Sequence, residues 1–410
     1  MEVVVLGCGG IGLPFAVALA SRGTRVVGVD TDAALVRRAS EGHTDLLDPG
    51  LEPALTGALA EGVIGFVVAA PRSYAPRAFV IAVPTPLDGL ARFDGGPVAE
   101  AMSAILAVAS PGDLVMVRST VPIGLTRTLA AGAAGRALLF ACCPDRSVSG
   151  AAFAEQFSVP NPVGGLDDAA SRAAAEVLAP LGEVVALSSP EAAEALKLIA
   201  NAWRDARFAI ANQFAMICEQ AGLDFEEVRA AGARGFARAD IPRAGPVGGP
   251  CLGKDVGLLA GSAAGGAALL VAARALNHDV IERAAKTTVA LVAADRRPAR
   301  ILVAGLAFKG RPATRDRRGS PGVALLERLR SLLPQAAIAG WDPAGAPGEG
   351  AAAAKGATAV LLANDHPDLA AAAWLEGCVE GALVYDLCGA LDGPVRSDLR
   401  VVRFGRGTRS

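Results

Sequence analysis

Short apolar runs rich in β-branched residues alternate with Ala/Leu-rich stretches over the first 190 residues of the chain. The apolar runs predict strands, and the stretches between them predict helices. This alternation is typical of a parallel sheet covered by helices on both faces. The predicted strands are residues 3–6, 24–30, 79–83, 114–118, 137–142 and 184–187.

The pattern changes after Pro190, where apolar residues recur at steps of three or four. They are Leu196, Ile199, Trp203, Ala206, Ile210, Phe214 and Ile217. This spacing predicts one helix of about thirty residues that ends near Gly222. A helix of this length between two α/β regions commonly joins them and often carries a dimer interface.

A second alternation of strands and helices begins at Arg300 with the run ILVAG. Ser320 and Pro321 predict the start of a helix, because serine is a favoured N-cap and proline a favoured first helical residue. Further strands are predicted at residues 338–341, 359–363 and 382–386, and residues 342–358 read as a surface connection rich in Gly, Ala and Pro. The chain therefore predicts a second α/β domain.

Composition limits the possible functions. The 410 residues include 39 Lys plus Arg and 41 Asp plus Glu, a net charge of −2 that argues against nucleic-acid binding. A hydrophobic content of 52% excludes a disordered chain, and the length suggests two or three domains. The uncharged stretch at residues 3–21 lacks the pattern of a signal peptide, and residues 256–273 are interpreted as a buried helix pair and not as a membrane span.

Seven cysteines are present, at positions 8, 142, 143, 218, 251, 378 and 388. The number is odd and no Cys-x-x-Cys pair occurs, so we expect reduced thiols, a cytoplasmic location and no bound metal. A site built from histidines is also not expected, because the chain has three histidines.

Gly7, Gly9 and Gly12 follow the first predicted strand with the spacing Gly-x-Gly-x-x-Gly and stand at the start of a helix. Such a turn lets the backbone approach a pyrophosphate, which the helix N-terminus then binds. Asp30 ends the next predicted strand, where a carboxylate accepts bonds from a ribose 2′-hydroxyl and repels a 2′-phosphate. These residues predict a dinucleotide site that prefers NAD to NADP.

Cys251 lies in the glycine-rich segment AGPVGGPCLGKD, residues 244–255, close to Lys254 and Asp255. A nearby lysine can favour a reactive thiolate, whereas the other six cysteines are interpreted as small buried residues. Lys197 and Asn201 are four residues apart and lie on one face of the long helix. By itself, that pair is more typical of a solvated helix surface than of a site.

Several further segments are similar to motifs of one enzyme family. They are VPTP (residues 83–86), RSTVPIG (118–124), CPDR (143–146), NPVGG (161–165), EALKLIANAWRD (194–205), GGPCLGKD (248–255) and GLAFKGRPATRDRRGSP (305–321). With the glycine fingerprint, they make the whole chain resemble the UDP-glucose/GDP-mannose dehydrogenase family. The resemblance implies two Rossmann-like doubly wound domains joined by a long central helix, with NAD in the first and a UDP-sugar in the last.

The resemblance also implies an activity, a domain division and a set of site residues. Members oxidise the C6 alcohol of a nucleotide sugar to a carboxylate with two NAD, through a thiohemiacetal and a thioester on a cysteine. The implied domains are 1–187 for NAD, 188–292 for the helical dimerisation region with the cysteine loop, and 293–410 for the UDP-sugar. The implied catalytic residues are Cys251, Lys197, Asn201, Asp255, Thr120 and Asp145. The implied NAD-binding residues are Gly7, Gly9, Gly10, Ile11, Gly12, Asp30, Thr85, Thr120 and Lys254. The implied substrate-binding residues are Lys197, Asn201, Arg238, Gly248, Lys309 and Arg318.

The chain departs from the family pattern at four positions. Asp145 stands where a glutamate is usual, Ser149 where glucose-oxidising members often have a second glutamate, and Asp240 where N-acetylhexosamine members often have asparagine. Gly253 replaces a Pro or Glu. The CPDR form resembles the branch that acts on UDP-N-acetylmannosamine or UDP-N-acetylglucosamine.

Two alternative functions remain open from the sequence. One is a two-electron dehydrogenase of the hydroxyacid type, which needs neither the cysteine nor the second α/β domain. The other is a non-catalytic protein that binds nucleotide sugars on the same fold, because a fold can persist after its chemistry is lost.

Overall fold

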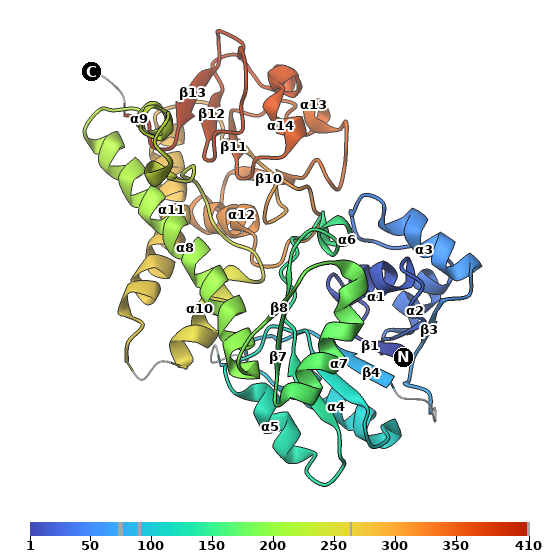
Figure 1. Ribbon diagram of the computed structural model, residues 1–410. Helices are drawn as coiled ribbons and strands as arrows, with labels where there is room; N and C mark the ends of the chain where they lie inside the picture. The colour runs from blue at the N-terminus through green and yellow to red at the C-terminus, as the bar shows by residue number, and fades with distance from the viewer. Residues whose placement is uncertain (73–76, 89–91, 263–264, 408–410) are drawn as a thin grey trace. The chain divides into compact units, whose positions relative to one another are not determined.

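The computed structural model describes residues 1–72, 77–88, 92–262 and 265–407. The chain divides into two compact units (Figure 1). The first unit comprises Met1–Ala200 with Gly257–Ala264, and the second comprises Asn201–Val256 with Gly265–Ser410. Two helices, α8 (Pro190–Gln220) and α10 (Leu252–Gly261), contain the division points.

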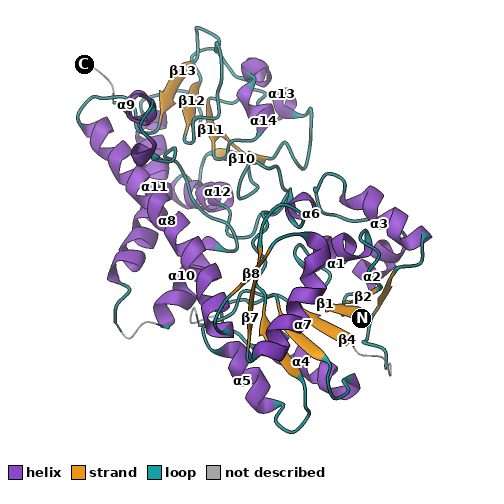
Figure 2. Cartoon of the chain, viewed as in Figure 1, coloured by secondary structure: helices purple, strands orange, loops and turns teal. Residues whose placement is uncertain are grey.

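The described part of the first unit contains an eight-stranded sheet with the order β3-β2-β1-β4-β5-β6-β7-β8 (Figure 2). The strands are β1 (Glu2–Leu6), β2 (Val26–Val29), β3 (Ile64–Val67), β4 (Arg77–Ile81), β5 (Leu114–Val117), β6 (Leu139–Cys142), β7 (Asn161–Gly165) and β8 (Val184–Ala186). Neighbouring strands are parallel except β6 and β7, which are antiparallel. The first six strands have the order of a dinucleotide-binding doubly wound sheet, and the order reverses between β1 and β4.

Helices cover both faces of this sheet, which is why most of its strand residues are apolar. In β1, Val3 and Val5 pack into one hydrophobic core and Val4 and Leu6 into another. The helices of the unit are α1 (Gly12–Ala20), α2 (Ala33–Ser40), α3 (Leu51–Ala60), α4 (Gly96–Val108), α5 (Leu125–Gly132), α6 (Ala152–Glu155) and α7 (Asp168–Leu178), with a short 3₁₀ turn η1 (Ala179–Leu181).

The described part of the second unit contains a parallel five-stranded sheet with the order β10-β9-β11-β12-β13. The strands are β9 (Arg300–Ala304), β10 (Ala337–Trp341), β11 (Ala359–Leu362), β12 (Leu383–Asp386) and β13 (Arg400–Arg403). Its other elements are α9 (Phe225–Ala233), η2 (Ala237–Ala239), α11 (Ala268–Ala293), α12 (Pro321–Leu332), α13 (Gly350–Ala353), α14 (Pro367–Ala370) and η3 (Ala372–Gly377). This is the second common doubly wound order, and it reverses between β9 and β11.

The predicted fold class is confirmed. The ten predicted strands are all observed with small shifts at their ends, and the long helix is α8, with 31 residues. Ser320 caps α12 as predicted, because its hydroxyl accepts hydrogen bonds from the amides of Gly322 and Val323.

Three strands were not predicted, namely β3, β7 and β13. The segment of β7 reads NPVGG, and Pro and Gly are poor strand formers, so only its pairing with β6 and β8 makes it a strand. The strands β3 and β13 are the short edge strands of their sheets, and their four residues carry little pattern.

Two predictions about surface and burial are wrong in part. The stretch 256–273 does form parts of two helices, but Leu269 and Val271 at the start of α11 are 75% and 57% exposed. Residues 263 and 264 of that stretch lie outside the described residues. The predicted surface connection 342–358 begins with a buried residue, since Asp342 is 4% exposed and its carboxylate accepts hydrogen bonds from two backbone amides. Within the described residues, the helices are all too short or too polar to cross a membrane.

We predict that replacing Ser320 by alanine lowers the free energy of unfolding by about 1 kcal/mol, because two backbone amides at the start of α12 then lose their acceptor. Urea unfolding of the two proteins measures the difference. Ser320→Thr, which keeps the hydroxyl, should retain most of the stability. Equal stability of the alanine variant and the unchanged protein would contradict this role.

Candidate active site

The predicted site residues of the first unit lie where its parallel strands end. Gly7 follows β1, Asp30 follows β2, Thr85 lies four residues after β4, and Thr120 and Asp145 lie three residues after β5 and β6. Because parallel strands all end at the same edge, the sheet brings these residues to its carboxyl edge. Ligands of open α/β sheets bind at this edge, beside the point where the strand order reverses.

The glycine-rich turn after β1 has the close backbone packing that a dinucleotide site requires. A Cβ on Gly12 would lie 1.8 Å from the carbonyl oxygen of Gly7, so no side chain fits there. Cβ atoms on Gly9 and Gly10 would meet nothing within 4 Å, which leaves the face of the turn open. Ile11 is the N-cap of α1 and offers no side-chain acceptor to the first amides of that helix. These amides and the helix dipole fit a pyrophosphate.

Asp30 is held in place by backbone amides. One carboxylate oxygen accepts from the amide of Cys8 at 2.8 Å, and the other accepts from the amide of Asp32 at 2.9 Å. The carboxylate thus stands next to the glycine turn, as a ribose acceptor does in this fold. Burial, with the charge of Asp30 as a smaller cause, raises the pKa of the Cys8 thiol to about 12, so Cys8 is a neutral packing residue.

The loops after β4 and β5 are tied together. The hydroxyl of Ser119 donates to the carbonyl oxygen of Val83 at 2.7 Å, and the amides of Arg118 and Ser119 both donate to Ile81. These bonds hold Thr85, which is buried, and Thr120, which is half-buried, on adjacent loops.

Asp145 forms a buried ion pair with Arg118, at 2.9 Å between Oδ1 and Nη2. Gln156 contacts both groups, since its side-chain oxygen accepts from Arg118 and its amide donates to Asp145. Burial would raise the pKa of Asp145, but the charges of Arg118 and Lys197 and a hydrogen bond from Ser147 lower it overall. Asp145 is therefore an anchored carboxylate, and Lys197 acts on it electrostatically.

Another buried carboxylate fixes the start of α8. Glu194 accepts hydrogen bonds from the backbone amides of Gly124 and Thr126 and from the hydroxyl of Thr126. Glu194 thereby caps the N-terminus of α5, because Gly124 is the N-cap residue of that helix and Thr126 belongs to its first turn. The cap ties the segment that follows Thr120 to the part of α8 that carries Lys197.

Cys251 is the exposed cysteine of the chain. It directly precedes α10, and its carbonyl oxygen accepts the amide of Asp255 at 2.8 Å as the first bond of that helix. A helix N-terminus stabilises negative charge, which suits a thiolate. The pKa of Arg318 is raised, chiefly by its hydrogen bonds to Asp316 and with a smaller part from the charge of Cys251, so Arg318 is in electrostatic reach of the sulfur.

Asn201 and Asp255 meet in the second unit. The side-chain amide of Asn201 donates to Oδ2 of Asp255 at 2.5 Å, and both residues are buried. Nζ of Lys254 is 2.7 Å from Oδ1 of the same carboxylate. Asn201 is thus not part of a solvated helix surface. The structure thus brings together three of the predicted residues, Asn201, Lys254 and Asp255, at the start of α10.

The loop that carries Cys251 packs against the loop between β9 and α12. The amide of Gly249 donates to the carbonyl oxygen of Gly319 at 2.8 Å, and a Cβ on Gly248 would lie 2.4 Å from that same oxygen. The β9–α12 loop starts at the carboxyl end of β9, beside the reversal point of the second sheet, where a ligand is expected. It carries Lys309, whose ammonium lies 5.6 Å from the ring centroid of Phe308, and Arg318.

Arg238 is a predicted substrate-binding residue, and Asp240 and Gly253 are two of the positions at which the chain departs from the family pattern. Arg238 is an exposed residue of η2, and its guanidinium stacks on Phe236 at 4.7 Å. Asp240 pairs with Arg207 at 2.6 Å. A Cβ on Gly253 would meet open space, so the missing Pro or Glu side chain leaves no packing defect.

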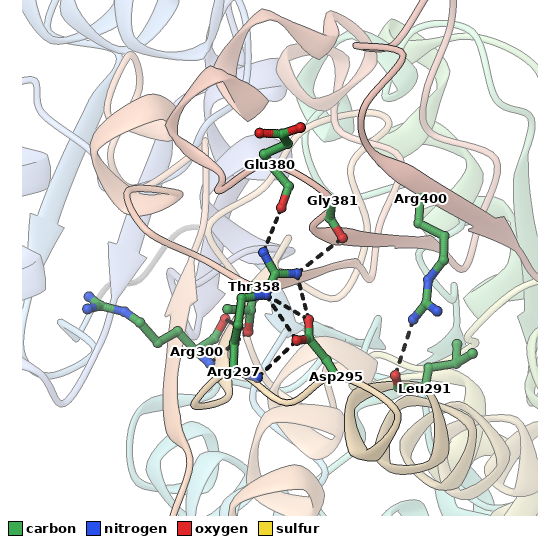
Figure 3. Close-up of polar contacts among 8 residues, drawn as sticks. All are labelled: Leu291, Asp295, Arg297, Arg300, Thr358, Glu380, Gly381 and Arg400. Atoms are coloured by element: carbon green, nitrogen blue, oxygen red, sulfur yellow. Dashed lines mark hydrogen bonds and ion pairs between the residues drawn. The ribbon is translucent and has the colours of Figure 1, made fainter.

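A cavity of about 240 Å³ lies elsewhere in the second unit. Figure 3 shows polar contacts among residues of this region. Leu383 and Arg400 line the cavity, and each is the first residue of its strand. The cavity therefore lies at the amino edge of the sheet, opposite the edge where ligands of this fold bind. The Arg297 guanidinium in this region donates hydrogen bonds to the carboxylate of Asp295 and to the backbone oxygens of Glu380 and Gly381. These contacts join the segment before β9 to the segment before β12, which indicates a structural role.

Fold and glycine turn together define a dinucleotide-dependent protein. Residues 1–181 match the NAD-binding domain of the UDP-glucose/GDP-mannose dehydrogenase family, and residues 191–279 match its central domain. The chain belongs to this family, and NAD is the cofactor of its first unit.

Curated relatives agree with this assignment. The chain is 30% identical over 389 residues to a UDP-N-acetyl-D-mannosamine dehydrogenase of Pyrococcus horikoshii, with 91% of both chains covered. It is 34% identical over 348 residues to an enzyme of the same name from Yersinia pestis, covering 78% of this chain and 80% of the relative. The solved structure of the Pyrococcus horikoshii enzyme covers 100% of both chains with a TM-score of 0.88 and 27% identity. A UDP-glucose dehydrogenase from Pyrobaculum islandicum has a TM-score of 0.83 and 26% identity, covering 99% and 98% of the chains.

Several site residues were not singled out from the sequence, namely Arg118, Gln156 and Glu194. Arg118 and Glu194 lie within the segments RSTVPIG and EALKLIANAWRD, but their partners Asp145 and Thr126 are 27 and 68 residues away. Spacing along the sequence therefore does not indicate these contacts. Arg118 and Glu194 carry one recognisable signal, since each is a charged residue among apolar neighbours. A charged side chain that is buried in such a place must be paired.

We predict that iodoacetamide at pH 8 modifies Cys251 in the folded protein and leaves Cys8 and Cys143 intact. Burial is the main cause that raises the pKa of both buried thiols to about 12, so only about one molecule in ten thousand carries the reactive thiolate at that pH. Peptide mass spectrometry reports the modified positions. Modification of the two buried thiols before Cys251 would refute the assignment.

Proposed function

We propose that this protein oxidises the C6 alcohol of a UDP-sugar to the carboxylate with two NAD, using Cys251 as a nucleophile. The observation that carries the proposal is the packing of the Cys251 loop on the β9–α12 loop, which carries Lys309 and Arg318. The family membership supports NAD-dependent oxidation of a nucleotide sugar.

Cofactor binding is assigned to residues of the first unit. The glycine turn fits the pyrophosphate, Asp30 the ribose, and Thr85 and Thr120 the nicotinamide end. Bound NAD supplies the hydride acceptor for each of the two oxidation steps. Lys254 is assigned to the cofactor by resemblance, and its ion pair with Asp255 supports a position close to the reacting group.

The sulfur allows a four-electron oxidation at one carbon. The first oxidation removes a hydride and a proton from the alcohol and yields an aldehyde. The Cys251 thiolate then adds to the carbonyl carbon, so that a C–S bond forms and the electrons of the C=O π bond move to the oxygen. This tetrahedral adduct can release, as a hydride, the hydrogen that the carbon has kept. The second oxidation gives a thioester, which water cleaves to the carboxylate and the free thiol.

Lys197 and Asn201 are assigned to the oxygen on the reacting carbon. A cation and an amide donor stabilise negative charge that develops there, in the aldehyde-forming step and in the tetrahedral adducts. Asp255 is assigned to the water that cleaves the thioester, since its carboxylate already accepts from Asn201 and pairs with Lys254. Asp145, kept ionised by Arg118, is assigned to support the charge of Lys197.

The substrate is assigned to the second unit. Lys309 and Arg318 suit a nucleotide phosphate, and Gly248 and Arg238 are assigned to the substrate by resemblance. Relatives named UDP-N-acetyl-D-mannosamine dehydrogenase support a UDP-N-acetylhexosamine over UDP-glucose. We propose the domain limits 1–187, 188–292 and 293–410 for NAD, the helical region and the nucleotide sugar.

We also propose that the protein is a homodimer through α8. An exposed apolar stripe follows one side of this helix and consists of Ile199, Trp203, Ile210, Phe214 and Ile217, which are 42–60% exposed. Large apolar side chains at this regular spacing favour burial against a second copy of the helix.

The test of the function is the ratio of NADH formed to UDP-N-acetylmannosamine consumed, which should be about two. Cys251→Ala should abolish acid formation, because no adduct can form on the aldehyde. UDP-N-acetylglucosamine, UDP-glucose and GDP-mannose complete the substrate panel, which is followed by absorbance and by mass spectrometry of the product.

Other results would favour the alternatives. A ratio of one, unaffected by Cys251→Ala, would favour a two-electron alcohol dehydrogenase. Binding of UDP-sugars in calorimetry with no NADH from any member of the panel would favour a non-catalytic protein.

For the dimer, Phe214→Lys should lower the mass measured by light scattering after size exclusion from two chains to one, because a charge in an apolar interface is costly. Val185→Lys is the matched control, since Val185 is 38% exposed on β8 and lies outside the stripe. A single-chain mass for the unchanged protein would contradict the proposal.

A further inference from the structure

Four polar residues between α8 and α11 have no role in the proposed chemistry. Asp205 and Asn212 belong to α8, and Arg274 and Asn277 belong to α11. Asp205, Asn212 and Asn277 are fully buried at 0% exposure, and the Arg274 side chain is 25% exposed. Burying such groups costs free energy unless they are hydrogen-bonded, so their partners show what they stabilise.

Part of the network joins the two helices. The side-chain amide of Asn212 donates to Oδ1 of Asn277 at 3.0 Å. The amide of Asn277 donates in turn to the backbone oxygen and to Oδ1 of Asp205, at 2.9 and 3.0 Å. Arg274 completes the network with an ion pair to Asp205, at 2.7 Å between Nη1 and Oδ1.

Two members also reach the segment that leads to Cys251. Oδ1 of Asn212 accepts the backbone amide of Gly245 at 2.7 Å. The second arm of the Arg274 guanidinium, Nη2, donates to the carbonyl oxygen of Val247 at 3.1 Å. These contacts lie six and four residues before Cys251.

The segment is therefore held from two directions. The network binds it at residues 245 and 247, and the bond from Gly249 to Gly319 binds it two residues further on. Three attachments at alternate residues leave the backbone little freedom immediately before the cysteine. Arginine suits the junction because its planar fork reaches the carboxylate and the carbonyl oxygen at once.

We propose that Arg274, supported by Asp205 and Asn277 and together with Asn212, is a positioning residue that sets where the Cys251 sulfur stands. The catalytic meaning of this role rests on the proposed function. A shift of the sulfur by about 1 Å is enough to lower the rate of covalent attack by one to two orders of magnitude.

The test compares two arginines of α11. Arg274→Gln removes both arms of the fork, whereas Arg283→Gln removes another ion pair between α11 and α8, the one to Glu219 at 3.3 Å, which does not involve the cysteine segment. We expect Arg274→Gln to lower kcat at least about tenfold with an unchanged Kd for NAD, and Arg283→Gln to change kcat less than about twofold.

Two more variants separate positioning from stability. In Asp205→Asn with Arg274→Gln, no uncompensated buried charge remains, so this protein should fold and still show the loss in kcat. Arg274→Lys keeps the ion pair to Asp205 but lacks the fork, and should restore the melting temperature while restoring kcat only in part. Equal loss of kcat in the Arg274→Gln and Arg283→Gln variants, or full kcat in the double variant, would overturn the proposal.

The rate of Cys251 alkylation by iodoacetamide gives a readout that needs no turnover. We expect a change of at least about threefold in Arg274→Gln and in the double variant, and none in Arg283→Gln, because only the first two alter the surroundings of the sulfur. Unchanged alkylation in the double variant would overturn the positioning role. A protein inactive on every UDP-sugar would overturn the proposed function alone, since alkylation would still report on the sulfur.

Discussion

The close backbone contact between Gly248, Gly249 and Gly319 is the constraint on which the candidate active site depends. It brings the Cys251 loop onto the β9–α12 loop, at the carboxyl edge of the second sheet. A side chain at Gly248 would meet the Gly319 carbonyl oxygen at 2.4 Å, so neither loop could keep its place. Cys251, the proposed nucleophile, and the loop that carries Lys309 and Arg318 thus belong to one packed structure within the second unit.

Buried polar groups define the surroundings of that loop and of the cofactor edge. The pair Arg118 and Asp145 holds the first unit's edge, and the network of Asp205, Arg274 and Asn277 holds the segment before Cys251. The carboxylates of both networks are buried and paired with an arginine, and a buried carboxylate without such a partner would be costly. Such networks specify one arrangement of their loops, which an apolar core of similar size would leave less defined.

The sequence was sufficient for much of the fold. Most strands are apolar runs, as burial on both faces of a sheet requires, and such runs can be recognised in the sequence. The cap of α12 can be recognised as well, because Ser320 and the amides that it caps are close together in the sequence. It failed at β7, where the residues Asn, Pro and Gly oppose a strand and only pairing with neighbours produces one. It also failed at Leu269 and Val271, because an apolar side chain does not reveal from its own sequence whether another segment covers it.

For the candidate site, the sequence identifies the residues, whereas their contacts follow from the folded structure. Cys251, Asp255, Asn201 and the glycine turn are recognisable because their motifs are contiguous or one helical turn apart. The hydrogen bond from Asn201 to Asp255 spans 54 residues, and the one from Asn212 to Gly245 spans 33. Such pairings depend on how helices pack and where loops close, which is a property of the folded chain as a whole, since no local pattern encodes the distance between two residues far apart along the sequence.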